Sequence, residues 1–234
     1  MDLLEKKSDN DFELEHWWIK TRIHYLIKTI FSVEKNINKV IEVGAGTAPN
    51  LKILMRKFSF KRLVAFDINY PKDEVKGEID FHSDLDSIED KFDLVLLMDV
   101  LEHVDDDLHY LNLWKANLCK KGSYIFCTVP AFNSLWSSHD TKLAHYRRYT
   151  LKEVRKLFSD SGIEIKESGY IFNFLFPIMY LMRKVLKVES SSGGLSRQNP
   201  LLNFFLINFF KLEYILSKVI KIPFGTSVYL VARC

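Results

Sequence analysis

The segment Lys39–Gly46, which reads KVIEVGAG, decides the fold of this chain. Its first five residues are mostly apolar or β-branched and predict a buried strand. The two glycines that follow allow a tight turn and a close approach of the backbone to a ligand. Apolar side chains then recur at helical spacing over residues 49–58. A strand that passes through a glycine turn into a helix is typical of the first unit of an α/β sheet.

The same alternation of short apolar runs and helical spacing continues along the chain. Further strands are expected at residues 62–66, 92–98, 124–129, 164–172 and 226–232, and helices at 106–119 and 151–161. Thr150 and Glu153 have the spacing of a capping box at the start of the second of these helices. Strands that alternate with helices of this length predict an α/β, doubly wound, mostly parallel sheet with both faces covered.

Two unusually apolar stretches, residues 172–182 and 201–210, interrupt this alternation near the C-terminus. Each is shorter than the roughly 20 apolar residues that a membrane span needs. A linker rich in small residues separates them at 190–196. The basic residues Arg183, Lys184 and Lys187 follow the first stretch, and Lys211, Lys218 and Lys221 follow the second. We therefore expect peripheral membrane contact or a lipid-tail groove along 172–187 and 201–221, with a helical layer on the sheet or a subunit interface as alternatives.

Composition limits the class of protein. The 234 residues are 47% hydrophobic and 27% charged, which suits a single folded domain and excludes a mainly disordered or collagen-like chain. Cys119, Cys127 and Cys234 form no CxxC pair, so we expect neither a disulfide framework nor a metal site. Without a basic and then apolar leader, a cytoplasmic location is expected, peripheral at the inner face of the membrane if the apolar stretches make contact.

Net charge is unevenly distributed along the chain. The overall value of +3 combines −6 over residues 1–140 with +9 over residues 141–234. A basic second part suggests an anionic partner, and nucleic acid, phospholipid and phosphorylated small molecules all fit that description.

The glycine turn points to a particular cofactor. Asp67 ends the second expected strand, twenty-one residues after Gly46, where a carboxylate can accept hydrogen bonds from ribose hydroxyls. Pro49 occupies the last glycine position of a dinucleotide fingerprint, and the chain has no phosphate loop. Glu42 beside the turn would repel a pyrophosphate and attract an ammonium group. These residues favour S-adenosylmethionine (SAM) over NAD.

At these residues the chain resembles class I SAM-dependent methyltransferases over residues 38–165 and the last strand. The resemblance implies a Rossmann-like sheet of seven strands. It also implies that Glu42, Gly44 and Gly46 form the cofactor loop, that Asp67 holds the ribose, that Asp84 and Leu85 flank the adenine, and that Asp99 and Val100 run beside the methionine moiety. Ala48 departs from the pattern, because many members have a third glycine there. Asp84 could instead be a turn residue.

The loop after the fifth expected strand concentrates residues suited to an acceptor site. Methyl transfer to oxygen needs alignment and a base near neutral pKa, and His139 and His145 are the candidate catalytic bases. Arg147 and Arg148 could clamp a phosphate or carboxylate, and Trp136 and Tyr146 supply aromatic surface for substrate binding. The alternative is a structural loop held together by arginine and aspartate.

A narrower resemblance rests on residues 16–18 (HWW) and 145–150 (HYRRYT), and it extends to 223–227. Members of this subset are uncharacterised or linked to surface-saccharide and lipid-linked pathways. Trp17 and Trp18 either cover the active site or serve packing alone. Glu102 is interpreted as a helix-start charge, and His103 stays open between site and structure.

Together these features predict a methyltransferase that moves a methyl group from SAM to a small or lipid-linked acceptor, at a hydroxyl. The expected organisation is a helical cap at 1–37, a SAM-binding core at 38–169, an apolar helical insertion at 170–222 and a final core strand at 223–234. The chain lacks the Pro-Pro-aromatic element of nucleobase amino methyltransferases, so no nucleic-acid partner is expected. The alternatives are an inactive SAM-fold scaffold at a membrane surface and, less favoured, a nicotinamide oxidoreductase.

Overall fold

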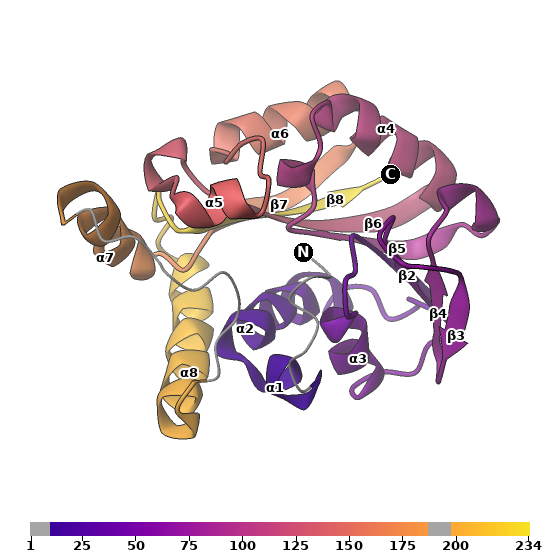
Figure 1. The fold of residues 1–234 in the computed structure, drawn as a ribbon, viewed down its shortest axis with the longest axis horizontal. Helices are drawn as coiled ribbons and strands as arrows, with labels where there is room; N and C mark the ends of the chain where they lie inside the picture. The colour runs from indigo at the N-terminus through magenta and orange to yellow at the C-terminus, as the bar shows by residue number, and fades with distance from the viewer. Residues whose placement is uncertain (1–9, 187–197) are drawn as a thin grey trace.

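A computed structural model describes residues 10–186 and 198–234 (Figure 1). Its centre is an eight-stranded sheet in the order β3-β4-β2-β1-β5-β6-β8-β7. The strands are β1 (Lys39–Val43), β2 (Arg62–Phe66), β3 (Glu74–Lys76), β4 (Ile79–His82), β5 (Phe92–Met98), β6 (Cys119–Pro130), β7 (Glu164–Ile171) and β8 (Ser227–Arg233). β1 pairs in parallel with β2 and β5, whereas β8 runs antiparallel between β6 and β7. The predicted doubly wound α/β fold is confirmed.

The strand count exceeds the expected seven by one. Two short strands lie outside the six ranges expected from the sequence: β4, and the three-residue β3, which pairs antiparallel with β4 at the sheet edge. Gly77, at φ 64°, joins the two strands in a hairpin. Segments this short leave little periodicity in a sequence, so β3 carries no pattern that would have predicted it.

Helices cover both faces of the sheet. They are α1 (Asn10–Glu15), α2 (Trp17–Leu26), the π-helical η2 (Ile27–Phe31), α3 (Pro49–Met55), α4 (Asp107–Leu118), α5 (Ser138–Lys142), α6 (Leu151–Asp160), α7 (Leu175–Tyr180), the π-helical η6 (Leu181–Val185) and α8 (Pro200–Ser217); single 3₁₀ turns occur at η3 (Leu85–Ser87), η4 (Leu101–His103) and η5 (Asn133–Leu135). α1, α2, α3 and α8 lie on one face and α4 and α6 on the other (Figure 1). The capping box is present, with the Glu153 carboxylate accepting from the Thr150 amide at 2.6 Å.

The core is divided between the two faces by strand alternation. Val40 belongs to the cluster that includes α2 and α3, and the next residue, Ile41, belongs to the cluster that includes α4 and α6. Both side chains are fully buried. Because successive side chains of a strand point to opposite faces, one apolar run serves both helical layers.

Helix α8 is attached to the N-terminal helices, although about 180 residues separate them in the chain. The Asn203 side chain accepts from the Trp17 amide and donates to the Glu15 carbonyl, both at 2.8 Å. Phe210 stacks on Trp17 with ring centroids 5.4 Å apart, and Phe172 stacks on Trp18 at 4.4 Å. The two tryptophans are therefore part of an aromatic cluster between α2 and α8.

The outer surface of α7, η6 and α8 is apolar and exposed. Side chains there that are at least half exposed include Ile178, Leu181, Leu201, Phe204, Phe205, Leu212 and Ile215. Within the residues that the structure describes, none of the helices is both long and apolar enough to cross a bilayer. Lys187 and the expected linker at 190–196 lie outside the described residues.

Candidate functional site

The turn after β1 has a backbone shape that depends on its glycines. Gly44 and Gly46 lie at φ 68° and 54°, in the left-handed region that disfavours side chains. A Cβ on Gly44 would stand 2.8 Å from Cγ2 of Val100, so even an alanine would collide there. Ala48 also adopts a positive φ, 55°, at the start of α3. A glycine at this position would adopt the same conformation with less strain.

Asp67 holds this turn from the end of β2. Its carboxylate is almost fully buried and accepts from the Gly46 amide at 3.0 Å through Oδ2. Oδ1 accepts from the Asn69 amide, also at 3.0 Å. The spacing of Gly46 and Asp67 therefore does bring the glycine turn and the carboxylate into contact. The predicted ribose contact of Asp67 stays a prediction.

Glu42 is a buried carboxylate with spare bonding capacity. Oε1 accepts from Nδ2 of Asn50 at 2.5 Å, but Oε2 has no hydrogen-bond partner among the described residues. Burial raises the pKa of Glu42 to about 7, against the opposing effects of the Asn50 hydrogen bond and the Arg22 charge. A cationic group bound here could donate a hydrogen bond to Oε2 of Glu42.

A buried arginine from the N-terminal helices enters the same region. Arg22, on α2, is completely buried and forms an ion pair with Asp99 directly after β5. Its guanidinium carbon also lies 5.5 Å from the centre of the Trp18 ring. Burial lowers the pKa of Arg22 to about 10, and the charges of Glu42 and Glu102 oppose that shift. From the sequence, Arg22 was expected only to lie in the helical cap at 1–37. Its contact with Asp99 was not predicted, because no sequence motif relates a residue of α2 to the end of β5.

The predicted adenine-flanking residues follow β4, which is the neighbour of β2. Asp84 is exposed, and its carboxylate accepts from the Asp86 amide at 3.0 Å, capping the short turn η3. Leu85 is half-buried beside it. Thus Asp84 has the turn role named as its alternative, and a role toward adenine stays a prediction.

The loop after β6 is organised around Asp140, which sequence reasoning did not select. Asp140 is completely buried and accepts from Nδ1 of His145 at 3.0 Å and from Nε of Arg148 at 2.7 Å. The Ser137 amide and hydroxyl also donate to it. Burial alone would raise the pKa of Asp140, but the hydrogen bonds from His145 and Arg148 hold it well below its usual range.

This loop is attached to the segment that follows β5. The Tyr146 amide donates to the Glu102 carbonyl at 2.7 Å, and the Tyr149 hydroxyl donates to the Leu101 carbonyl at 3.1 Å. The rings of His103 and His145 meet edge to face, with centroids 4.6 Å apart. Burial raises the pKa of Glu102 to about 8. Glu102 and His103 therefore lie against this loop, and Glu102 is also the acidic residue in the first turn of η4.

The predicted acceptor residues differ in how strongly the fold engages them. His139, on α5, is half-buried, and burial lowers its pKa. Arg148 donates to Asp140 and to the Ala131 carbonyl, and Arg147 forms an ion pair with Asp107 at 3.1 Å. Trp136 donates to Thr141 at 3.3 Å, whereas the Tyr146 side chain is exposed. These contacts give both arginines structural partners, and their substrate roles stay predictions.

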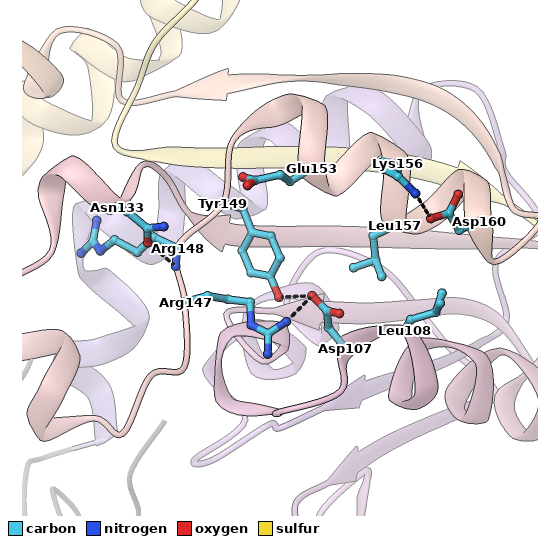
Figure 2. A pocket seen from close by; sticks show the side chains of 10 residues that line it. All are labelled: Asp107, Leu108, Asn133, Arg147, Arg148, Tyr149, Glu153, Lys156, Leu157 and Asp160. Atoms are coloured by element: carbon cyan, nitrogen blue, oxygen red, sulfur yellow. Dashed lines mark hydrogen bonds and ion pairs between the residues drawn. The ribbon is translucent and has the colours of Figure 1, made fainter.

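A groove of about 360 Å³ lies on the outer side of this loop, between α4 and α6 (Figure 2). Figure 2 shows the Arg147 guanidinium and the Tyr149 hydroxyl both directed at the Asp107 carboxylate. None of the predicted cofactor residues lines this groove. The glycine turn and the groove are therefore separate features.

Comparison with known proteins agrees with this geometry. A family model described as a methyltransferase domain matches residues 16–168. A SAM-dependent methyltransferase from Archaeoglobus fulgidus is structurally similar, with a TM-score of 0.56, 17% identity and 93% of each chain covered. Phosphoethanolamine N-methyltransferase 2 of Haemonchus contortus, solved with SAM, also has a TM-score of 0.56, with 14% identity, 96% of this chain covered and 57% of that one. No curated protein matches the chain.

Proposed function

The chain belongs to the methyltransferase-domain family, and from this premise we propose that it transfers a methyl group from SAM to a hydroxyl of a small or lipid-linked acceptor. The protein is a SAM-dependent methyltransferase. The observation that carries the proposal is the meeting of Glu42, Gly44, Asp67 and Asp99 at the carboxyl ends of the adjacent strands β1, β2 and β5. In open α/β sheets, ligands bind at these ends.

The residues present fit SAM. Its ammonium group would meet the unpartnered Oε2 of Glu42, and its carboxylate would share the Arg22 guanidinium now paired with Asp99. Gly44 has no Cβ to collide with the Val100 side chain, so the turn after β1 packs closely against the segment that follows β5. When bound, SAM supplies a methyl carbon on a positively charged sulfur that retains the electron pair of the broken bond.

The acceptor lies, in this proposal, against the loop after β6. Burial lowers the pKa of His139 and so favours its neutral imidazole, which in this proposal takes the proton of the reacting hydroxyl. His145 is held by Asp140 and lies beside Glu102 and His103, where it positions the acceptor oxygen. Alignment by these fixed side chains supplies much of the rate enhancement, because a displacement at carbon requires an in-line approach.

The exposed apolar surface of α7 and α8 supports an acceptor that carries a lipid chain or resides in a membrane surface. All exposed charges on residues 199–222 are positive, since Glu213, the only acidic residue there, is buried. An apolar helix face with basic residues suits the surface of an anionic membrane. Because of this apolar and basic surface, we prefer a lipid-linked acceptor over a water-soluble small molecule.

Titration calorimetry with SAM, and separately with NAD, tests the cofactor assignment. Loss of two hydrogen bonds to ribose costs about 1 kcal/mol each or more, so Asp67→Ala is expected to weaken SAM binding by about 10- to 100-fold. Asp160→Ala is the control, because it removes an exposed carboxylate that pairs with Lys156 on α6, and it should leave SAM affinity unchanged. Saturable NAD binding, or no SAM binding by the folded protein, would contradict the proposal and favour the scaffold alternative.

A further inference from the structure

Glu102, His103 and His145 form a cluster in which one possible ligand atom from each residue lies within 4.8 Å of the other two. Glu102 and His103 belong to the turn η4, which follows β5, and His145 belongs to the loop after β6. No metal site was expected from the sequence, because the cysteines form no CxxC pair. His103 and His145 lie forty-two positions apart in the chain and come together only in the fold.

Hydrogen bonds from the backbone and from side chains hold these three residues close together. The Tyr146 amide, next to His145, donates to the carbonyl of Glu102 itself, and Tyr149 donates to Leu101. His145 is further fixed by Asp140, which accepts from its Nδ1 and is in turn held by Arg148. The cluster is therefore built into the fold and does not depend on mobile surface side chains.

One oxygen of the Glu102 carboxylate in this cluster lacks a hydrogen-bond partner. Glu102 is 1% exposed, and within the described part of the chain its Oε2 accepts no hydrogen bond. Arg22 and Arg148 act on Glu102 electrostatically, but neither donates to Oε2. A buried carboxylate oxygen without a partner is costly, and a bound cation would remove that cost.

His145 has the hydrogen-bonding arrangement of a metal-binding histidine, in which a second residue holds the ring nitrogen that does not bind the metal. Metal-binding histidines almost always donate their other ring nitrogen to a carboxylate or a carbonyl, which orients the ring. The hydrogen bond from Nδ1 of His145 to Asp140 has this form and directs the ligand role to Nε2. Two imidazoles with one carboxylate suit Zn²⁺, Fe²⁺ or Co²⁺ better than Mg²⁺ or Ca²⁺, which prefer oxygen ligands.

We infer that Glu102, His103 and His145 bind one divalent transition-metal ion, with Asp140 as the outer support of His145. Three protein ligands leave a coordination position for water or a substrate oxygen, as in catalytic zinc sites. Metal binding itself needs no SAM. Only the role of the metal, which is to bind the acceptor hydroxyl and ease its loss of a proton to His139, rests on the proposed function.

The test uses the full-length protein stripped of metal with a chelator and titrated with Co²⁺ or Zn²⁺, without SAM. We expect about one equivalent to bind, with a Co²⁺ absorption spectrum of a nitrogen- and oxygen-ligated site. Loss of the outer partner in Asp140→Asn should weaken metal binding by roughly 10- to 100-fold. Loss of a direct ligand should weaken it more, in each of the variants His103→Ala, His145→Ala and Glu102→Gln. His109→Ala, an exposed histidine on α4, is the matched control and should bind normally.

A second measurement needs no variant and so avoids the risk of misfolding. Addition of Zn²⁺ to the wild-type protein should shift the side-chain ¹⁵N resonances of His103 and His145 and leave those of His109 in place. Stoichiometric binding that is unchanged in all three ligand variants, or no saturable binding below about 100 µM, overturns the inference. Because SAM is absent throughout, failure here leaves the methyltransferase proposal intact, and failure of SAM binding leaves this inference intact.

Discussion

The guanidinium of Arg22, completely buried on α2, forms an ion pair with the Asp99 carboxylate at the end of β5. The pair joins the N-terminal helices to the strand edge at which the cofactor is expected. Asp99 itself has φ 57°, a conformation uncommon outside glycine, and its Oδ1 also accepts from the Thr128 hydroxyl at 3.2 Å. The helical cap is thus linked to the site by a charge as well as by aromatic packing.

A double-mutant cycle on this pair should show strong coupling. Asp99→Asn leaves a fully buried cation unpaired and is expected to cost about 3–5 kcal/mol of unfolding free energy. Arg22→Met should cost less, because the Asp99 side chain is 26% exposed and can be hydrated. The double variant should recover part of the combined loss. Urea unfolding measures the stability of all three variants. If the two single effects add to the double effect within about 0.5 kcal/mol, the coupling is contradicted. Lys20→Met, which breaks the exposed pair with Glu15, is the control.

SAM affinity should depend on pH through Glu42. Its pKa of about 7 means that the carboxylate is largely protonated at pH 6 and ionised at pH 8, and only the ionised form attracts the ammonium group. Affinity is therefore expected to rise by up to about tenfold over this range. Glu42→Gln should bind weakly with a flat profile, measured by calorimetry, and Asp84→Asn should retain the wild-type profile. An unchanged pH profile in Glu42→Gln would remove Glu42 from this role.

The same group has an opposite effect on the free protein. Because the pKa of Glu42 is higher in the folded state than in the unfolded chain, the folded state holds the additional proton between the two values. Stability of the free protein should then fall as pH rises from about 4.5 to 7. Urea unfolding of the wild type and of Glu42→Gln across this range isolates the contribution.

Asp140 should contribute stability that is lost in acid. Its pKa is depressed in the folded state, so the contribution is present above the ordinary carboxyl range and declines as pH falls below about 4. Asp140→Asn leaves the Arg148 side chain, which is 7% exposed, without its counter-ion, and is expected to cost about 3 kcal/mol at pH 7.

Urea unfolding at pH 7, at about pH 4 and at about pH 2.5 checks this prediction. The decline on the acid side should be smaller in Asp140→Asn than in the wild type. Asp160→Asn, which breaks an exposed pair with Lys156, should change stability by no more than about 0.5 kcal/mol. Equal acid sensitivity of Asp140→Asn and wild type would show that Asp140 contributes no such stability.

The exposed face of α8 should mediate binding to anionic vesicles. Phe205 is 60% exposed, and burial of its side chain in the lipid interface is worth about 1.5–3 kcal/mol, so Phe205→Asp should reduce vesicle partitioning by at least about tenfold. Val75→Asp, an exposed apolar position on β3, is the control. Sedimentation with phosphatidylglycerol vesicles measures the effect. An equal loss of vesicle binding in Phe205→Asp and Val75→Asp would contradict a membrane role. So would a Phe205→Asp variant that keeps vesicle binding but turns from a dimer into a monomer.

Several elements could be predicted from sequence because their patterns are local. The bounds expected for β1, β2 and β5 agree with the structure, since each is a continuous apolar run bounded by polar or turn residues. The start of α6 was predictable from its capping box. Strand β3 was not predictable, and neither was the partnership of Arg22 with Asp99 across 77 positions of the chain.

The α/β fold and the position of the glycine turn after β1 follow from the sequence alone. Strand length, helical spacing and the conformational freedom of Gly44 and Gly46 are properties of short segments. Only the tertiary structure decided which charges meet. Asp140 gathers His145 and Arg148, and Glu102 meets His103 and His145, because β5 and β6 are neighbours in the sheet and the loops that follow them end at the same edge. Such contacts depend on distance in space, which the order of residues along the chain does not record.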